Sequence, residues 1–262
     1  MKRFLVLWSS LMFTTASYAD TETINWYVDG NTYTQTTCQT GGDVILPTPP
    51  TKRGYVFKGW HENYIPVEYL ESSGTQYIDT DFIPQIGTKL QIRVTLLSGC
   101  TTTSSSQNFA GTTARGALTY FAPLARSVGA SQCYYYFNSY NATSICDIND
   151  TITASIEIGA TGATIQQNNE TKNTINNYTK SGVFEPALSI YLFAGHVTSG
   201  QGVAEKACAR MYYAKIWDNG VLVHDFVPVL DSSKRPAMYD KVERKFYYNI
   251  GTGDFSAGPA IY

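Results

Sequence analysis

The sequence predicts an all-β protein, an antiparallel jelly-roll sandwich with a small β module at its N-terminal end. Three observations indicate this class. Apolar and polar residues alternate over many short runs, which is the pattern of half-buried strands. Turn-forming residues recur about every eight to twelve residues, and no helical period of apolar residues is present. The chain has 20 Tyr and 12 Phe among 262 residues and only 15% charged residues, which suits pleated faces.

The first segment, residues 1–19, has the features of a cleaved signal peptide. An apolar run follows Lys2 and Arg3, and the small residues Ser17 and Ala19 stand where a signal peptidase cuts. A membrane anchor is the alternative, but the apolar run is too short to span a bilayer comfortably. We therefore expect an exported protein, either extracellular, on the cell surface or periplasmic, with no membrane insertion after cleavage.

The charge balance argues against nucleic acid and anionic membranes as the main partner. Two of the 19 basic residues lie in residues 1–19, so 17 Lys and Arg remain against 21 Asp and Glu. A net negative charge disfavours nucleic acid and anionic membranes as partners. No P-loop, GxGxxG, GxSxG or HExxH motif is present, and we expect no cofactor.

Five cysteines follow the predicted cleavage point, and export permits disulfides. Cys133 and Cys146 are near each other in sequence and are the favoured pair, with Cys100 and Cys208 as a second pairing. Cys38 would then be a free thiol. Five reduced, buried cysteines are the alternative. The absence of CxxC spacing argues against the usual zinc and thiol-redox sites.

Residues 20–60 predict a small β unit. Apolar residues alternate with polar ones from Ile24 to Val28, and Asp29-Gly30 is a hairpin-turn signal. Three prolines then stop any continuing ladder of strands. The segment ends in the motif GYVFKGW, residues 54–60.

Those residues resemble the Listeria–Bacteroides repeat, also called the InlB B-repeat. The resemblance rests on Gly42, Pro47, Pro50 and the closing motif at 54–60. It implies a small β-grasp-like module of the kind found in surface and exported bacterial proteins, where it acts as a spacer or an interaction unit. A unit that only packs against the next domain is the alternative, and only one copy is present.

Residues 62–262 predict the sandwich. The clearest alternation runs from Thr88 to Leu96, with Leu90, Ile92, Val94 and Leu96 on one face. Two turns, Asn168-Asn169 and Asp218-Asn219-Gly220, predict hairpins. Further strands are expected over 117–125, 133–137, 151–158, 163–167, 170–174, 188–194, 207–217, 221–229, 237–240 and 245–249.

The two ends of this region are the most specific. The opening stretch EYLESSGTQYIDTDFIP and the run over 215–259 resemble concanavalin A-like, or laminin-G-like, jelly-roll domains of bacterial surface proteins and phage tail proteins. This resemblance implies the jelly roll. Asp81 stands where the family usually has Gly. The ending matches at Asp218, Gly220, Asp225, Pro228, Tyr239, Asp240, Phe246, Asn249, Gly251, Gly253 and Phe255.

The opening stretch also poses a chemical question. We interpret Ser72-Ser73-Gly74 as a hairpin turn and the stretch as the edge that starts the sandwich. Asp79 and Asp81 are the nearest approach to a carboxylate pair, but the three acids of an E-x-D-x-E strand are absent. We assign both aspartates a structural role. A calcium site would suit their chemistry, but no DxDxDG loop supports it, and we expect no metal.

Aromatic residues supply the candidate binding site. Three tyrosines follow one another at 134–136, so their rings must alternate between the two faces of a strand. Rings on the hollow face could stack on a sugar beside amide groups, and the candidate ligand-binding residues are Tyr134, Tyr136, Asn138 and Asn108. The alternative is that these rings only fill the interior of the sandwich.

These features together favour an exported, non-catalytic binding or adhesion protein that recognises a glycan or a surface protein. A glycoside hydrolase or lyase with an unrecognised site is the first alternative. A structural cell-surface component without a ligand is the second. His61, His196 and His224 are single and distant in sequence, so we expect them to be surface or hydrogen-bonded histidines rather than ligands.

Overall fold

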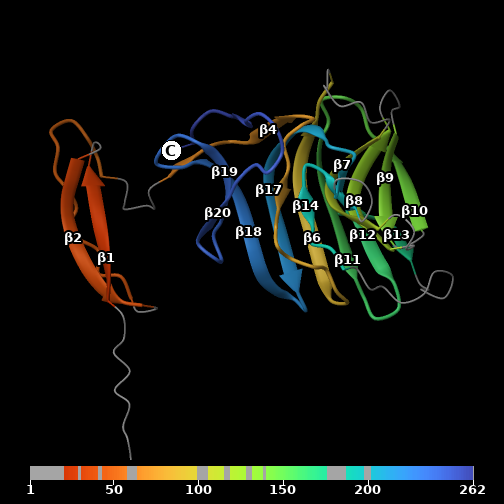
Figure 1. Ribbon diagram of the computed structural model, residues 1–262, viewed down its shortest axis with the longest axis horizontal. Coiled ribbons are helices and arrows are strands. Elements are labelled where there is room, and N and C mark those ends of the chain that lie inside the picture. Colours follow the sequence, from red (N-terminus) through yellow and green to blue (C-terminus); the bar gives the residue numbers. More distant parts are fainter. Residues whose placement is uncertain are drawn as a thin grey trace, which may run out of the picture. The chain divides into compact units, whose positions relative to one another are not determined.

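The computed structural model describes most of the chain after residue 20: residues 21–28, 31–40, 43–57, 64–98, 106–114, 119–127, 132–137, 140–175, 187–197 and 202–261. The expected signal peptide, Cys100, Asn138 and His61 lie outside these residues. The chain divides into two compact units, Met1–Glu62 and Asn63–Tyr262. All regular structure in the described residues is β (Figure 1). The all-β prediction is therefore confirmed.

In the described residues of the first unit, the regular structure is one hairpin. Strands β1 (Thr21–Val28) and β2 (Asn31–Gln39) pair antiparallel, and Val28 lies opposite Asn31. The pairing leaves only two residues between the strands, as the Asp29-Gly30 signal predicts. Trp26 is buried, and its indole N–H donates to the Thr36 hydroxyl at 2.8 Å. Residues 43–57 follow without a regular strand.

The second unit consists of two sheets. The larger has eleven strands, and its main path runs β13-β12-β11-β6-β17-β18-β19-β20. Its strands are β3 (Ile65–Pro66), β4 (Leu70–Ser73), β6 (Thr88–Leu96), β11 (Thr151–Ile158), β12 (Ala163–Gln167), β13 (Glu170–Ile175), β17 (Cys208–Asp218), β18 (Val221–Leu230), β19 (Pro236–Asp240), β20 (Lys245–Tyr247) and β21 (Ser256–Ala257).

The smaller sheet has eight strands, and its main path runs β10-β9-β8-β7-β14-β5. All its pairings are antiparallel except that of β15 with β7, which is parallel and was not expected. Its strands are β5 (Ile78–Asp79), β7 (Ser106–Ala114), β8 (Thr119–Ser127), β9 (Gln132–Phe137), β10 (Tyr140–Ile145), β14 (Tyr191–Leu192), β15 (Gly195–Val197) and β16 (Val203–Ala204).

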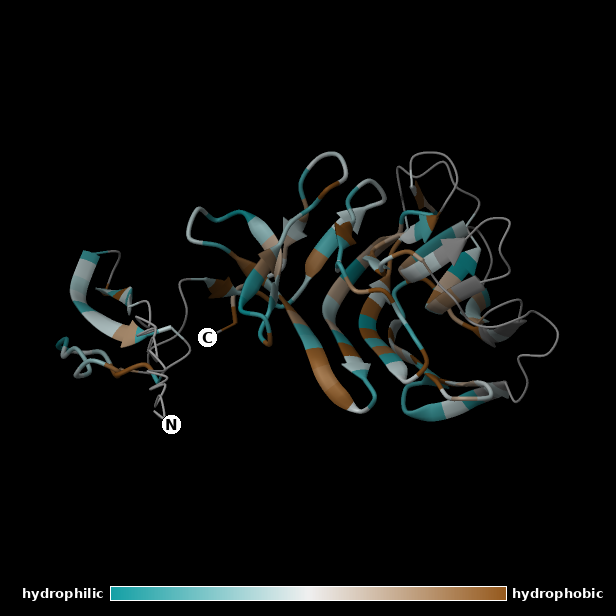
Figure 2. Cartoon of the chain, turned by 60° about the horizontal axis from the view of Figure 1, so that its bottom comes forward, coloured by the Kyte–Doolittle hydropathy of each residue, from teal (hydrophilic) through white to brown (hydrophobic). Residues whose placement is uncertain are grey.

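One apolar core joins the two sheets. The predicted face of β6 is fully buried, and strands in the middle of the second unit alternate between brown apolar and teal polar residues (Figure 2). On the eight-stranded sheet, Ile78, Leu124, Phe137 and Leu192 belong to the same core cluster. At about 25 cal/mol per Å² of apolar area removed from water, this shared core is the main stabilising term of the sandwich.

Two predicted hairpins are confirmed. Asn168 and Asn169 both have positive φ, 52° and 66°, between the paired strands β12 and β13. Asn219 and Gly220 have φ of 47° and 80° between β17 and β18. Positive φ at both central residues is the geometry of a type I′ turn, which Asn and Gly adopt at low cost.

The predicted hairpin at Ser72-Ser73-Gly74 is wrong. Strand β4, which includes Ser72 and Ser73, pairs with β17 and β21, whereas β5, which follows Gly74, pairs with β14 in the other sheet. The tripeptide is therefore a corner that carries the chain between sheets. The Gln76 side chain closes it, because its Oε1 accepts the Ser73 amide at 2.9 Å and the Ser72 hydroxyl at 3.0 Å.

Candidate functional site

The tyrosine run on β9 alternates between faces as expected. Tyr135 points into the core, is fully buried and donates its hydroxyl to Gln167 Oε1 at 2.6 Å on the opposite sheet. Tyr134 and Tyr136 lie on the other side, which we call the outer face of the eight-stranded sheet. Their rings stack at 6.0 Å between centroids with 16° between planes, and both are half-buried.

Strand register shows which residues share the outer face with this ring pair. Tyr134 lies opposite Ala125 of β8, which in turn lies opposite Asn108 of β7, and Tyr136 lies opposite Ala122. Directly opposed residues point to the same side of a sheet. Two strand spacings, about 10 Å, therefore separate the backbone of Asn108 from that of Tyr134, with small alanines between them.

Asn108 is the most unusual residue of this face. Its side chain is fully buried, and neither amide atom, Oδ1 or Nδ2, has a hydrogen-bond partner. Its backbone N–H is satisfied, since it donates to the Glu205 carbonyl at 2.6 Å. Buried polar side chains are normally hydrogen-bonded, so two orphan atoms in one amide require an explanation. Of the other predicted contacts, Asn138 lies outside the described residues.

A second aromatic group occupies the same face at its other end. Tyr191 of β14 lies opposite Gly111 of β7 and Asp79 of β5. Its ring stacks on His196 at 3.8 Å between centroids and 14°, and it lies 5.2 Å from the ring of Tyr77. The members come from segments more than a hundred residues apart, and sequence analysis did not find this group.

Hydrogen bonds and charge define the environment of the second group. His196 Nδ1 donates to the Ser189 carbonyl at 2.9 Å when that nitrogen carries the proton, so His196 is a hydrogen-bonded histidine, as expected. The Lys206 ammonium lies 5.9 Å from the Tyr77 ring centroid. Burial, and then the charge of Asp79, raise the pKa of Tyr191 to about 12. Its phenol therefore stays neutral and can donate a hydrogen bond.

The two aspartates of the opening stretch act locally. Asp79 accepts the Asp81 amide at 2.9 Å, and Asp81 pairs with Lys245 at 3.1 Å on the surface. Asp81 has φ of 60°, in the left-handed region. Gly, Asn and Asp are the residues that tolerate that conformation most readily.

One polar cluster in the C-terminal strands was also missed. Ligand atoms of His224, Asp240 and Glu243 all lie within 4.8 Å of one another. Each carboxylate already has a donor. Asp240 accepts His224 Nδ1 at 2.7 Å and two backbone amides, and Glu243 accepts the Tyr247 hydroxyl at 2.5 Å. Because these bonds engage the atoms that a metal would need, we interpret the cluster as an internal brace between β18, β19 and β20.

A disulfide links the favoured cysteine pair. Cys133 and Cys146 are bonded with an S–S length of 2.02 Å and close a loop with a sequence separation of 13. The bond joins Cys133 in β9, one residue before Tyr134, to Cys146, which directly follows β10. Cys38 is a half-buried free thiol. The second proposed pairing includes Cys100 and so lies outside the described residues.

Comparisons with known proteins bear on the N-terminal region. The family model of the Listeria-Bacteroides repeat domain matches residues 23–81. The N-terminal resemblance is therefore confirmed, with a match that extends beyond residue 60 into the first strands of the second unit. No match was found among curated proteins. In the described residues, no helix has the length and apolar character needed to cross a membrane.

Among solved structures, the chain is similar to a protein from Bacteroides ovatus ATCC 8483 that has been proposed to bind carbohydrate. The identity is 11% and the TM-score 0.49, over 75% of this chain. The aligned part spans 61% of the Bacteroides protein, less than two thirds of its length. Similarity at this level does not indicate what this chain binds.

Proposed function

We propose that this is an exported, non-catalytic binding protein that holds a glycan on the outer face of its eight-stranded sheet. The stacked pair Tyr134 and Tyr136 is the observation that carries the proposal. Two half-buried rings with nearly parallel planes, on a sheet face away from the core, supply aromatic surface about two residues long. Carbon-bound hydrogens of a sugar ring pack well on the electron-rich face of such rings.

The polar half of the proposed site is Asn108. A sugar hydroxyl donates and accepts at the same atom, and the Asn108 amide has one unused acceptor and two unused donor hydrogens. Ala125, which lies between Asn108 and Tyr134, is small and, like Asn108, buried, so a sugar reaches this amide only when the cover over this part of the sheet opens. Binding sites commonly combine an apolar wall with a few such polar groups.

Export supports the choice of partner. The Listeria–Bacteroides repeat occurs in surface and exported proteins, and the region of residues 1–19 predicts a signal peptide. A protein that leaves the cell with a disulfide and a tyrosine-rich sheet meets glycans and surface proteins first. Of these two, an aromatic pair on the same sheet face as the Asn108 amide favours the glycan.

A glycan array probed with the full chain tests the proposal, followed by calorimetry with the best ligand. We expect Tyr134→Ala and Tyr136→Ala each to weaken binding about tenfold or more, because each removes one ring of the platform. Tyr213→Ala is the matched control, since Tyr213 is also half-buried on a strand but belongs to the eleven-stranded sheet.

The control should leave affinity within about twofold of the original chain. A blank array, or equal losses from Tyr213→Ala and Tyr134→Ala, would refute this site. Release of reducing ends from any bound polysaccharide would replace the binding function with a glycan-cleaving one.

A further inference from the structure

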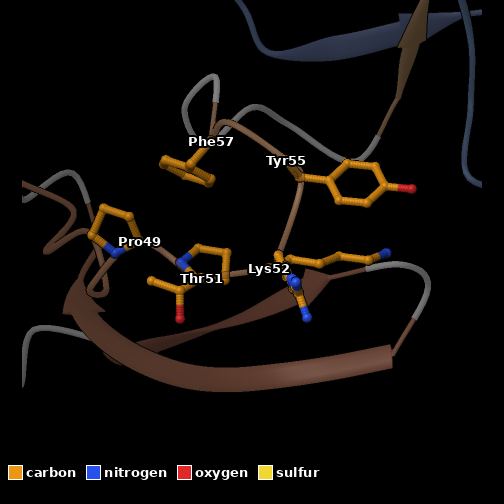
Figure 3. Close-up of a pocket in the computed structure, with 7 residues that line it drawn as sticks. Pro49, Thr51, Lys52, Tyr55 and Phe57 are labelled. Carbon is orange, nitrogen blue, oxygen red and sulfur yellow. The ribbon is translucent and has the colours of Figure 1, made fainter.

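The N-terminal unit contains a pocket that the glycan proposal does not use. It has a volume of about 450 Å³ and lies in the segment after β2 (Figure 3). Its walls are two prolines, a threonine, two cations and two aromatic rings: Pro49, Pro50, Thr51, Lys52, Arg53, Tyr55 and Phe57. The volume is within the range of ligand sites and suits one or two side chains of a partner.

A tight turn builds this pocket. Tyr55 N–H donates to the Lys52 carbonyl at 3.1 Å, and Gly54 between them has φ of 83°. A positive φ at the third residue is the mark of a type II turn, and it returns Tyr55 to the side of Lys52. The Lys52 ammonium lies 4.4 Å from the Tyr55 ring centroid, and both side chains extend in one direction, away from Pro49 and Phe57 (Figure 3).

The segment that contains the pocket, residues 43–57, is strongly apolar for an exposed segment. Ile45 is 71% exposed, Leu46 62%, Tyr55 70% and Val56 80%. Single exposed apolar residues are ordinary, but several within one short segment mark a contact surface. Aliphatic side chains offer a sugar no hydrogen bond, whereas they form the centre of protein interfaces. The surface therefore favours a polypeptide over a glycan.

Charge specifies the polypeptide further. Lys52 and Arg53 are the two cations among the described residues of this unit, and both line the pocket. The pocket thus presents a positive rim beside an apolar wall, and a complementary partner is acidic with an apolar anchor.

We propose that this pocket binds an acidic peptide segment of a partner protein. One apolar side chain of the segment packs between Pro49 and Phe57, and flanking carboxylates pair with Arg53 and with Lys52. The planar guanidinium of Arg53 can bind a carboxylate through two hydrogen bonds. The protein is then bivalent, with a glycan on the sandwich and a protein on the repeat unit.

The test is fluorescence anisotropy of the full chain with a labelled synthetic peptide in which Asp and Glu flank a single Phe. Its matched probes replace the acids by Asn and Gln, or the Phe by Ser. We expect binding of the acidic probe alone, weakened by added salt. Lys52→Gln with Arg53→Gln should raise its Kd about 3- to 10-fold, since two exposed ion pairs are lost. Tyr55→Ala should have a similar effect.

Two control variants separate a local effect from a general one. Lys234→Gln with Arg244→Gln removes one exposed Lys and one exposed Arg from the second unit, and Tyr27→Ala removes an exposed ring from the hairpin. Neither should change the Kd. Equal binding of the neutral peptide, equal losses in the controls, or binding of an anionic oligosaccharide in place of the peptide would each overturn the proposal. Because the outer-face variants leave this probe untouched, failure here is distinct from failure of the glycan site.

Discussion

The orphan amide of Asn108 permits a prediction in which stability and binding change in opposite directions. Burying a polar group without a hydrogen bond costs about 1–3 kcal/mol. Asn108→Val removes both orphan atoms and places a β-branched residue in a strand, where it is favoured. We expect the free energy of unfolding of the second unit to rise by about 1–3 kcal/mol, while glycan binding is lost.

The assay is denaturant unfolding of the full chain, with the two units resolved as separate transitions where they unfold independently. In a unit of this size, 1 kcal/mol corresponds to a change in Tm of about 2–4 °C. Asn108→Ala is a second variant without added volume, and it should be neutral or mildly stabilising. This variant separates the effect of removing the amide from the effect of a clash between the valine side chain and its neighbours.

Gln167→Met is the matched control. Gln167 is also a buried amide on a strand, but its Oε1 accepts the Tyr135 hydroxyl. Gln167→Met removes this hydrogen bond of the buried Tyr135 hydroxyl and should cost about 1–3 kcal/mol. If Asn108→Val and Asn108→Ala are as destabilising as Gln167→Met, the Asn108 amide has a structural partner, such as a bound water, and the reasoning fails.

Three further predictions concern the frame of the site. Replacing Cys133 and Cys146 by Ala should cost about 3 kcal/mol, because the bond closes a short loop in the unfolded chain, and a reductant-dependent drop in Tm checks it. Asp81→Gly should keep stability within about 0.5 kcal/mol, whereas Asp81→Val should cost about 1–2 kcal/mol at this φ in denaturant unfolding. The pKa of Tyr191 in the folded state is raised above its ordinary value of 10.0, so the contribution of Tyr191 to stability is complete below pH 10 and declines from there to about pH 12. Tyr191→Phe should therefore make the free energy of unfolding depend less on pH over that window.

Sequence predicts those parts of the fold that are decided by neighbours along the chain. The hairpins at Asn168-Asn169 and Asn219-Gly220 follow from the ability of Asn and Gly to adopt positive φ, which needs no tertiary context. The corner at Ser72-Ser73-Gly74 has equally good turn residues. It differs from a hairpin only because β5 joins a different sheet from β4, and that choice depends on β14, more than a hundred residues later.

One part of the candidate site can likewise be predicted from neighbours along the chain, and another part cannot. Successive side chains of a strand point to opposite faces, so the sequence predicts that Tyr134 and Tyr135 point to opposite sides of the sheet, and they do so in the structure. The group of Tyr77, Tyr191 and His196 could not be predicted, since it requires β5, β14 and β15 to meet at one end of the sheet. The residue spacing within each of these segments does not indicate that the three strands lie side by side.

The direction of the Asn108 side chain shows how a single irregularity decides a site. Strict alternation would place Asn108 on the same face as Ala110, whose partner Leu124 is in the core. A bulge in β7 makes Asn108 lie opposite Ala125 instead, so Asn108 and Ala110 face opposite sides. The sequence does contain a signal for this. Gly111 interrupts the strand, and a Cβ there would meet the Phe121 carbonyl oxygen at 2.3 Å. Glycine inside a strand indicates a bulge or a close backbone approach, and Gly111 therefore marks the place where periodicity should not be used to assign faces.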